Sequence, residues 1–195
     1  MLVPSARTVA ATVITRVVVD KAFAAAALDA ELDRAIQLEP RDRALATELV
    51  YGTLRLLGWL EDRISRHAKR GIGGLDPVVR AHLAVAAYQI FVLTRVPAFA
   101  AVNEAVNAIR SLRKGGGTQV AGFANAVLRK LSSEPRPAEG ELARAAMEAV
   151  DPALRDAIVR SIGHDAALSL LGSFAGWSPP LGLRVEERAE RDAWI

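Results

Sequence analysis

The 195-residue chain contains no cysteine, which excludes disulfides, thiolate metal sites and a cysteine nucleophile. Aromatic residues make up only 5% of the chain, whereas alanine, leucine and valine are abundant, a composition that favours closely packed helices. Charges interrupt the apolar stretches, as at Asp20, Lys21 and Arg80, so we expect no membrane span. The first residues lack the basic-then-apolar order of a signal peptide. We therefore expect a cytoplasmic protein.

Motifs for catalysis and for metal or cofactor binding are also missing. His67, His82 and His164 stand apart without metal-ligand spacing. The glycine-rich stretches 71–74 and 115–117 follow no predicted strand and lack the Lys-Ser/Thr of a P-loop, so we interpret them as loops. We predict no catalytic, cofactor-binding or metal-binding residue in this chain, which favours a binding module.

The net charge of +3 is unevenly distributed. Residues 1–136 hold 19 lysines and arginines against 12 acidic residues, an excess of +7, whereas residues 137–195 hold 6 against 10, an excess of −4. A basic first part favours a polyanionic partner, because lysine and arginine displace counterions from phosphates. A surface whose charge is uneven without functional meaning is an equally good interpretation of charge alone.

Apolar residues recur at spacings of three and four, which predicts an all-α fold. The expected helices cover about residues 5–19, 21–36, 41–70, 77–93, 97–109 and 118–131, followed by short helices near 141–150, 152–161 and 165–174. The segment 77–93 is the most apolar and should lie at the centre. A linker rich in proline and serine, residues 132–137, falls where the charge balance changes.

Individual residues refine these helices. Ser5 should cap the first helix, and Phe23 and Ile36 should face inward from the second. In the long third segment, Gly52 should allow a close helix crossing, and Gly58 should mark a kink.

Several short stretches together carry a family resemblance. They are Ser5–Arg7, Asp42–Leu45, Glu48–Arg55, Ala87–Ile90, Thr94–Pro97, Ala101–Val106 and Gly122–Arg129. Their order over about 130 residues resembles the NusB family of helical RNA-binding proteins. The resemblance is strongest to the NusB-like N-terminal domain of the bacterial rRNA cytosine-C5 methyltransferases called RsmB, Sun or Fmu. It implies a NusB-like helical bundle followed by a short helical linker region.

The resemblance also implies a division into three parts. Residues 1–133 would form the RNA-binding domain, 134–177 a helical linker, and 178–195 the start of a methyltransferase N-terminal subdomain. The family's catalytic domain, which binds S-adenosylmethionine and carries two cysteines, would follow. Because this chain has no cysteine, it cannot methylate cytosine itself. We expect a truncated form of such an enzyme that binds RNA, most simply small-subunit rRNA, and holds no cofactor.

The resemblance and the charges together give candidate RNA-binding residues, because arginine and lysine make most phosphate contacts. They are Arg7, Arg95, Arg110, Arg113, Lys114, Arg129 and Lys130. Arg7 is the best single candidate, because NusB proteins keep a basic patch near the N-terminus. An intramolecular structural role is equally plausible for Arg55 and Arg129. Tyr51 and Tyr88 could stack on bases, although core packing is the more plausible role for both.

Two other functions fit the sequence. The first is a stand-alone NusB-type transcription antitermination factor that binds RNA and a ribosomal protein. The second is a helical protein-interaction module that binds no nucleic acid.

Overall fold

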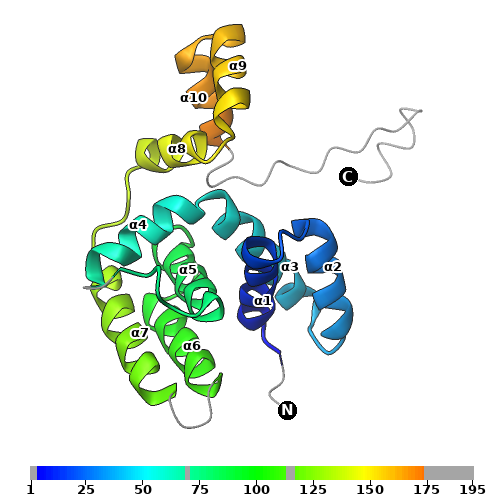
Figure 1. Cartoon of the computed structure of the whole chain (residues 1–195), viewed down its shortest axis with the longest axis vertical. Coiled ribbons are helices and arrows are strands. Elements are labelled where there is room, and N and C mark those ends of the chain that lie inside the picture. Colours follow the sequence, from blue (N-terminus) through cyan, green and yellow to red (C-terminus); the bar gives the residue numbers. More distant parts are fainter. Residues whose placement is uncertain (1–3, 69–70, 113–116, 174–195) are drawn as a thin grey trace.

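The computed structural model describes residues 4–68, 71–112 and 117–173. These residues form helices joined by loops and contain no strand, which confirms the all-α prediction. The helices, shown in Figure 1, are α1 (Ala6–Val19), α2 (Ala24–Arg34), α3 (Pro40–Arg55), α4 (Leu57–His67), α5 (Pro77–Phe91), α6 (Ala98–Ser111), α7 (Gly117–Ser132), α8 (Glu139–Glu148), α9 (Pro152–Ile162) and α10 (His164–Ser173). Residues 178–195, the expected start of a methyltransferase N-terminal subdomain, lie outside the described residues.

Helix α5 is the centre of the bundle, as predicted from its composition. The Asp76 side chain accepts a hydrogen bond from the Val78 backbone, and Pro77 occupies the first helical position, so the helix begins at a strong start signal. From Ala81 onward every residue of α5 is buried. Helices α1, α3, α4, α6 and α7 pack around it. A helix that is apolar on all sides is stable in water only with such a covering.

Helix α1 begins as predicted. The Ser5 side chain accepts a hydrogen bond from the Thr8 backbone while the Thr8 hydroxyl accepts one from the Ser5 backbone, which forms a capping box. Val13 and Ile14 then turn towards the core.

The predicted ends of α2 were wrong. Phe23 and Ile36 are 86% and 80% exposed, whereas Leu28 and Leu32, inside the helix, are buried. Lys21 adopts a positive φ of 57°, and Ala35 leaves the helical region, so α2 is shorter than the sequence pattern suggested. Phe23 and Ile36 therefore fall outside the helix whose inner face they were expected to join.

The long third segment is two helices, α3 and α4, that meet at Leu56. The break lies two residues before Gly58, where the kink was expected. The close helix crossing predicted at Gly52 is confirmed, because a Cβ atom there would collide with the Tyr88 ring of α5. The missing side chain lets α3 lie close to the central helix.

Helices α6 and α7 form a hairpin beside α5, and α8, α9 and α10 form a smaller unit beyond it (Figure 1). Met147, Ala167 and Leu171 make a separate small core in this unit, while Ala145 and Ala146 join the main core. No helix in the described part of the chain is long and apolar enough to cross a membrane.

Candidate functional site

Arg7 is the second residue of α1 and is half-buried against α5. Its Nε donates a hydrogen bond to Oε1 of Gln89 over 2.7 Å. Gln89 is only 1% exposed, and its Nε2 donates to the backbone oxygen of Val85 over 2.9 Å. Both ends of this buried amide are therefore engaged, and one of them orients Arg7.

A small cavity next to Arg7 is also lined by His82 and Glu104. Burial lowers the pKa of His82 to about 4, so its imidazole is neutral at neutral pH. Glu104 is exposed and forms no ion pair with Arg7. The Arg7 charge therefore has no neutralising carboxylate among the described residues.

Arg110 lies at the end of the α6–α7 hairpin where α6 ends and α7 begins. It is exposed in the last turn of α6, and its Nη1 donates to Oδ1 of Asn107 over 3.2 Å. The predicted residues Arg113 and Lys114 follow α6 in sequence but lie outside the described residues.

Arg95, Arg129 and Lys130 gather at the other end of the hairpin. Arg95 is exposed in the loop before α6, and Arg129 and Lys130 are exposed in the last turn of α7. Because α6 and α7 run in opposite directions, these residues lie roughly 18 Å along the helix axis from Arg110. The predicted residues therefore do not form one cluster.

Arg136 also lies at this end, and sequence analysis missed it. Its Nη2 donates to the backbone oxygen of Leu93 over 3.0 Å, which brings the linker after α7 against the end of α5. Nothing in the sequence around Arg136 pointed to this contact across 43 positions.

Basic residues at helix ends have a structural explanation that competes with an RNA-binding one. Arg110, Arg129 and Lys130 all lie in the last turn of a helix, where a cation interacts favourably with the helix dipole. Arg7 lies in the first turn, where the dipole disfavours a cation. Of these residues, Arg7 is therefore the one whose position helix stability explains least.

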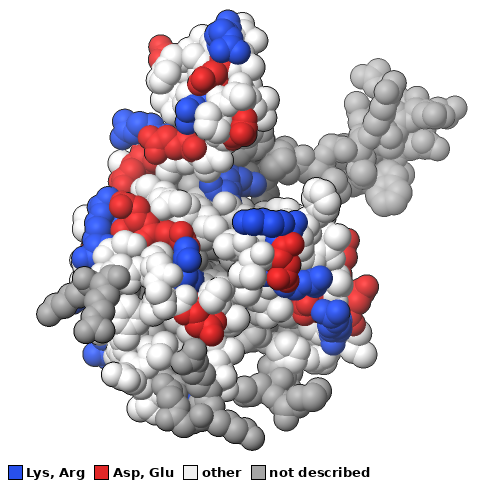
Figure 2. Space-filling view, in the orientation of Figure 1, with Lys and Arg blue, Asp and Glu red and all other residues white. Residues whose placement is uncertain are grey.

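Many other cations are paired within the fold. Arg16 and Arg34 both contact Glu31, Arg66 contacts Asp62, and Arg155 lies near Asp156. Figure 2 accordingly shows lysine and arginine beside aspartate and glutamate over the viewed face, without a continuous positive surface there. By contrast, Arg7, Arg95, Arg110, Arg129 and Lys130 form no ion pair with any described residue. Their charges are available to a partner.

The two tyrosines differ in accessibility. Tyr88 is buried, and its hydroxyl donates to Oε1 of Glu48 over 2.5 Å. Burial, followed by this hydrogen bond to Glu48, raises the pKa of Tyr88. Tyr51 is 38% exposed on α3. Stacking on a base is therefore excluded for Tyr88 and sterically open for Tyr51.

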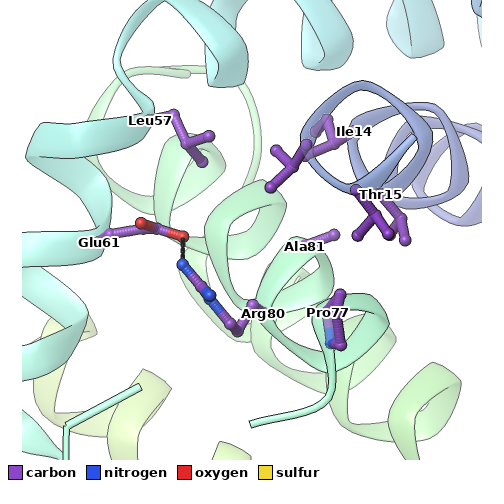
Figure 3. Close-up of a pocket in the computed structure, with 9 residues that line it drawn as sticks. Ile14, Thr15, Leu57, Glu61, Pro77, Arg80 and Ala81 are labelled. Carbon is purple, nitrogen blue, oxygen red and sulfur yellow. Dashed lines mark hydrogen bonds and ion pairs between the residues drawn. The ribbon is translucent and has the colours of Figure 1, made fainter. Parts of the chain in front are cut away.

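A cavity lies between α1, α4 and α5 (Figure 3). Ile14 and Leu57 give it apolar walls, and the ion pair between Glu61 and Arg80, 2.7 Å long, lies at its edge. Its volume is about 110 Å³, well below the roughly 300–1,000 Å³ of typical small-molecule sites. We assign it no ligand.

A cluster around Arg63 joins α4 to the linker and to α8, and sequence analysis did not identify it. The Arg63 side chain, 11% exposed, donates from Nη1 to Glu134 over 2.7 Å and from Nη2 to Glu141. Its guanidinium lies over the rings of Trp59 and Phe91, 4.9 and 5.5 Å from their centroids. Residues 134–141 are thus fastened to the bundle; we call this cluster the α4–α8 junction.

Two further contacts complete the α4–α8 junction. The His67 ring lies 2.5 Å from Glu134, and Trp59 Nε1 donates to Glu141 over 3.1 Å. Burial opposes ionisation of Glu134 and Glu141, but hydrogen bonds from Arg63 and from these neighbours outweigh it and lower the pKa of both carboxyl groups. Both glutamates are therefore ionised at neutral pH.

Comparison with known proteins identifies the family. The NusB family model matches residues 4–133. Ribosomal RNA small subunit methyltransferase B from Pseudomonas putida is 32% identical over 97% of this chain, which spans 42% of that enzyme's length. Transcription antitermination protein NusB from Burkholderia mallei is 33% identical over 61% of this chain and 80% of its own length.

Among solved structures, NusB from T. maritima aligns with a TM-score of 0.58 and 19% identity, covering 70% of this chain and 96% of its own. This structural similarity supports the fold, and the family model covers two thirds of the chain. The chain therefore belongs to the NusB family.

Proposed function

We propose that this chain is the RNA-docking part of an S-adenosylmethionine-dependent rRNA cytosine-C5 methyltransferase, with small-subunit rRNA as the partner. The observation that carries the proposal is the extent of similarity. The P. putida methyltransferase aligns with 97% of this chain, including α8 to α10, whereas the B. mallei NusB protein aligns with 61%. The helices beyond the family domain thus have counterparts in the methyltransferase.

The charges of the described residues support RNA as the partner. The basic excess lies within residues 1–136, and five candidate cations there are without an ion-pair partner among the described residues. Each such cation can neutralise a phosphate and release its counterion, which favours binding to a polyanion at low salt.

An equilibrium titration of the full chain with a fluorescently labelled small-subunit rRNA fragment tests this part of the proposal. If about four phosphates of a single strand are neutralised, the logarithm of affinity should fall with the logarithm of salt concentration at a slope of roughly −3. Competition with unlabelled tRNA measures how much of the binding is specific. Absence of binding at 50 mM salt, or binding insensitive to salt, would contradict an RNA-docking role.

The methyltransferase part of the proposal concerns the full-length enzyme to which we propose this chain belongs. We place S-adenosylmethionine and the cysteines in a catalytic domain that the NusB-like part would serve by holding the RNA substrate, and we place that protein in the cytoplasm. Reading the gene beyond codon 195 tests this. A continuing frame that encodes a cysteine-bearing methyltransferase domain would support it, and an immediate natural stop would contradict it.

The second candidate function is that of a stand-alone antitermination factor, which the B. mallei relative favours. Such a factor would bind a ribosomal protein together with RNA. Co-purification of the full chain with small-subunit ribosomal proteins, with and without RNA, distinguishes the two. A stoichiometric complex with one ribosomal protein would favour antitermination.

A further inference from the structure

We propose that Gln89 is a positioning residue for Arg7: from the buried face of α5 it holds the Arg7 guanidinium so that Nη1 and Nη2 can bind a phosphodiester of RNA. This inference rests on the proposed RNA-binding function and deepens it, because it names one phosphate contact and the residue that prepares it.

The first support is the geometry of Gln89. Its Oε1 accepts the hydrogen bond from Arg7 Nε and its Nε2 donates to the Val85 backbone oxygen. Because exchange of the two ends would place a donor against Arg7, the amide has one favourable orientation. A buried amide fixed in this way determines the direction of the half-buried guanidinium that it contacts.

The second support is the set of hydrogen-bond donors of Arg7 that remain free. Nε takes the hydrogen bond to Gln89, whereas Nη1 and Nη2 have no partner among the described residues. The neighbouring His82 is neutral at neutral pH and Glu104 forms no ion pair. Two parallel N–H groups of an arginine match two oxygens of a phosphate, and this paired geometry is stronger than a single contact.

The third support is the position of Arg7 on its helix. A cation in the first turn of α1 opposes the helix dipole, and the half-buried guanidinium gains no carboxylate in return. A contact that merely ties α1 to α5 needs no charge, because Val9, Val13 and other apolar residues already bury α1 in the core. Departures from locally favourable chemistry are expected where a side chain serves a function.

Arg41 offers a matched control for the charge of Arg7. It is the second residue of α3, as Arg7 is of α1, and it is exposed without a partner among the described residues. In the full chain, titrated with a labelled small-subunit rRNA fragment, Arg7→Ala should weaken binding about tenfold. The salt slope should become shallower by about 0.7 for a single strand. Arg41→Ala should change the affinity by less than about twofold.

Two isosteric or charge-preserving variants then test the positioning role. Gln89→Met has nearly the same shape but offers no oxygen acceptor, so Arg7 keeps its charge and loses its orientation, and RNA binding should weaken by about threefold to tenfold. Arg7→Lys keeps the charge but lacks the paired N–H groups, and it should lose about fivefold in affinity. Melting temperatures from circular dichroism establish that each variant is folded, and Arg7→Lys, a change near the surface, tests the proposal even if Gln89→Met unfolds.

The outcomes separate this inference from the proposed function. If the unmodified chain binds no RNA, the proposed function fails. If it binds RNA and Arg7→Ala behaves like Arg41→Ala, Arg7 makes no phosphate contact and the inference is overturned. If Arg7→Ala weakens binding but Arg7→Lys binds like the unmodified chain, or a folded Gln89→Met does so, positioning by Gln89 is overturned and RNA docking stands.

Discussion

Gly52 lies where the helix packing leaves no room for a side chain. Any side chain there would meet the Tyr88 ring, whose hydroxyl is itself held by Glu48. We expect Gly52→Ala to lower the free energy of unfolding by about 1–3 kcal/mol, because overpacking must displace a buried, hydrogen-bonded ring. Urea denaturation followed by circular dichroism measures this change.

Gly58 provides the comparison for that substitution. It also lies in a helix, but an added Cβ there would meet no atom within 4 Å. Gly58→Ala should therefore be neutral or stabilise the fold by up to about 1 kcal/mol, through helix propensity alone. Equal effects of the two substitutions would mean that the contact with Tyr88 does not limit the packing of α3.

Residues whose role depends on near neighbours in sequence were predictable. Ser5 caps α1 as predicted, and α5 begins at residue 77, the first residue of its expected range, and both starts depend on contacts within three positions. Phe23 and Ile36 were misplaced, because the positive φ of Lys21 before α2 and the non-helical backbone of Ala35 after it shorten the helix at both ends, which apolar spacing does not reveal. The partner of Arg7 was beyond prediction, because Gln89 lies 82 positions away and reads as part of an apolar helix.

At the scale of elements, the α4–α8 junction depends on two ionised carboxylates. The pKa values of Glu134 and Glu141 are lowered in the fold. The stability that they contribute is thus present above their ordinary pKa near 4.5 and is lost as the pH falls through the lower values of the folded state. Acid should therefore release α8 from α4, and Trp59, whose Nε1 donates to Glu141, can report it.

The corresponding experiment uses a chain with Trp177→Phe and Trp194→Phe, in which Trp59 is the single tryptophan. Its fluorescence should change as the pH is lowered below about 4.5. Adding Arg63→Met should move the midpoint of this change to higher pH, because the glutamates lose the cation that lowers their pKa. Identical acid profiles with and without Arg63 would contradict this account of the α4–α8 junction.

The existence of α8, α9 and α10 was predictable, since each begins near a proline or a polar residue and carries apolar residues at helical spacing. The contacts that attach these helices to the bundle were not predictable. Arg63 pairs with carboxylates 71 and 78 positions away, and nothing local distinguishes it from the exposed Arg66 one turn later.

At the scale of the whole molecule, the candidate cations lie at separate ends of the α6–α7 hairpin. Arg110 and the pair Arg129 and Lys130 share no partner among the described residues and are roughly 18 Å apart. If RNA contacts both ends, the losses in binding free energy from Arg110→Ala and from Arg129→Ala with Lys130→Ala should add within about 0.5 kcal/mol. RNA titrations of the two variants and of their combination measure this.

The same titrations decide whether these residues serve RNA or only the helix dipoles. In the dipole interpretation the melting temperature falls while the RNA affinity is unchanged. A combined loss well below the sum would indicate that the two ends do not act independently. The overall charge predicted a basic first part of the chain, but charge counts carry no information about which cations are paired, as Arg16 and Arg66 are. Figure 2 shows basic and acidic residues next to one another on the viewed face.

The stacking of Arg63 on Phe91 has a mechanical consequence. Phe91 and Gln89 lie two residues apart on α5, about 3 Å along its axis. The same helix therefore carries both Phe91, which contacts Arg63 of the α4–α8 junction, and Gln89, which contacts Arg7. The linker after α7 has little freedom to move, since Arg136 and Glu134 are each hydrogen-bonded to the bundle. A displacement of α8 to α10 would therefore be transmitted to α5 and, through Gln89, to Arg7, the residue that we propose contacts RNA.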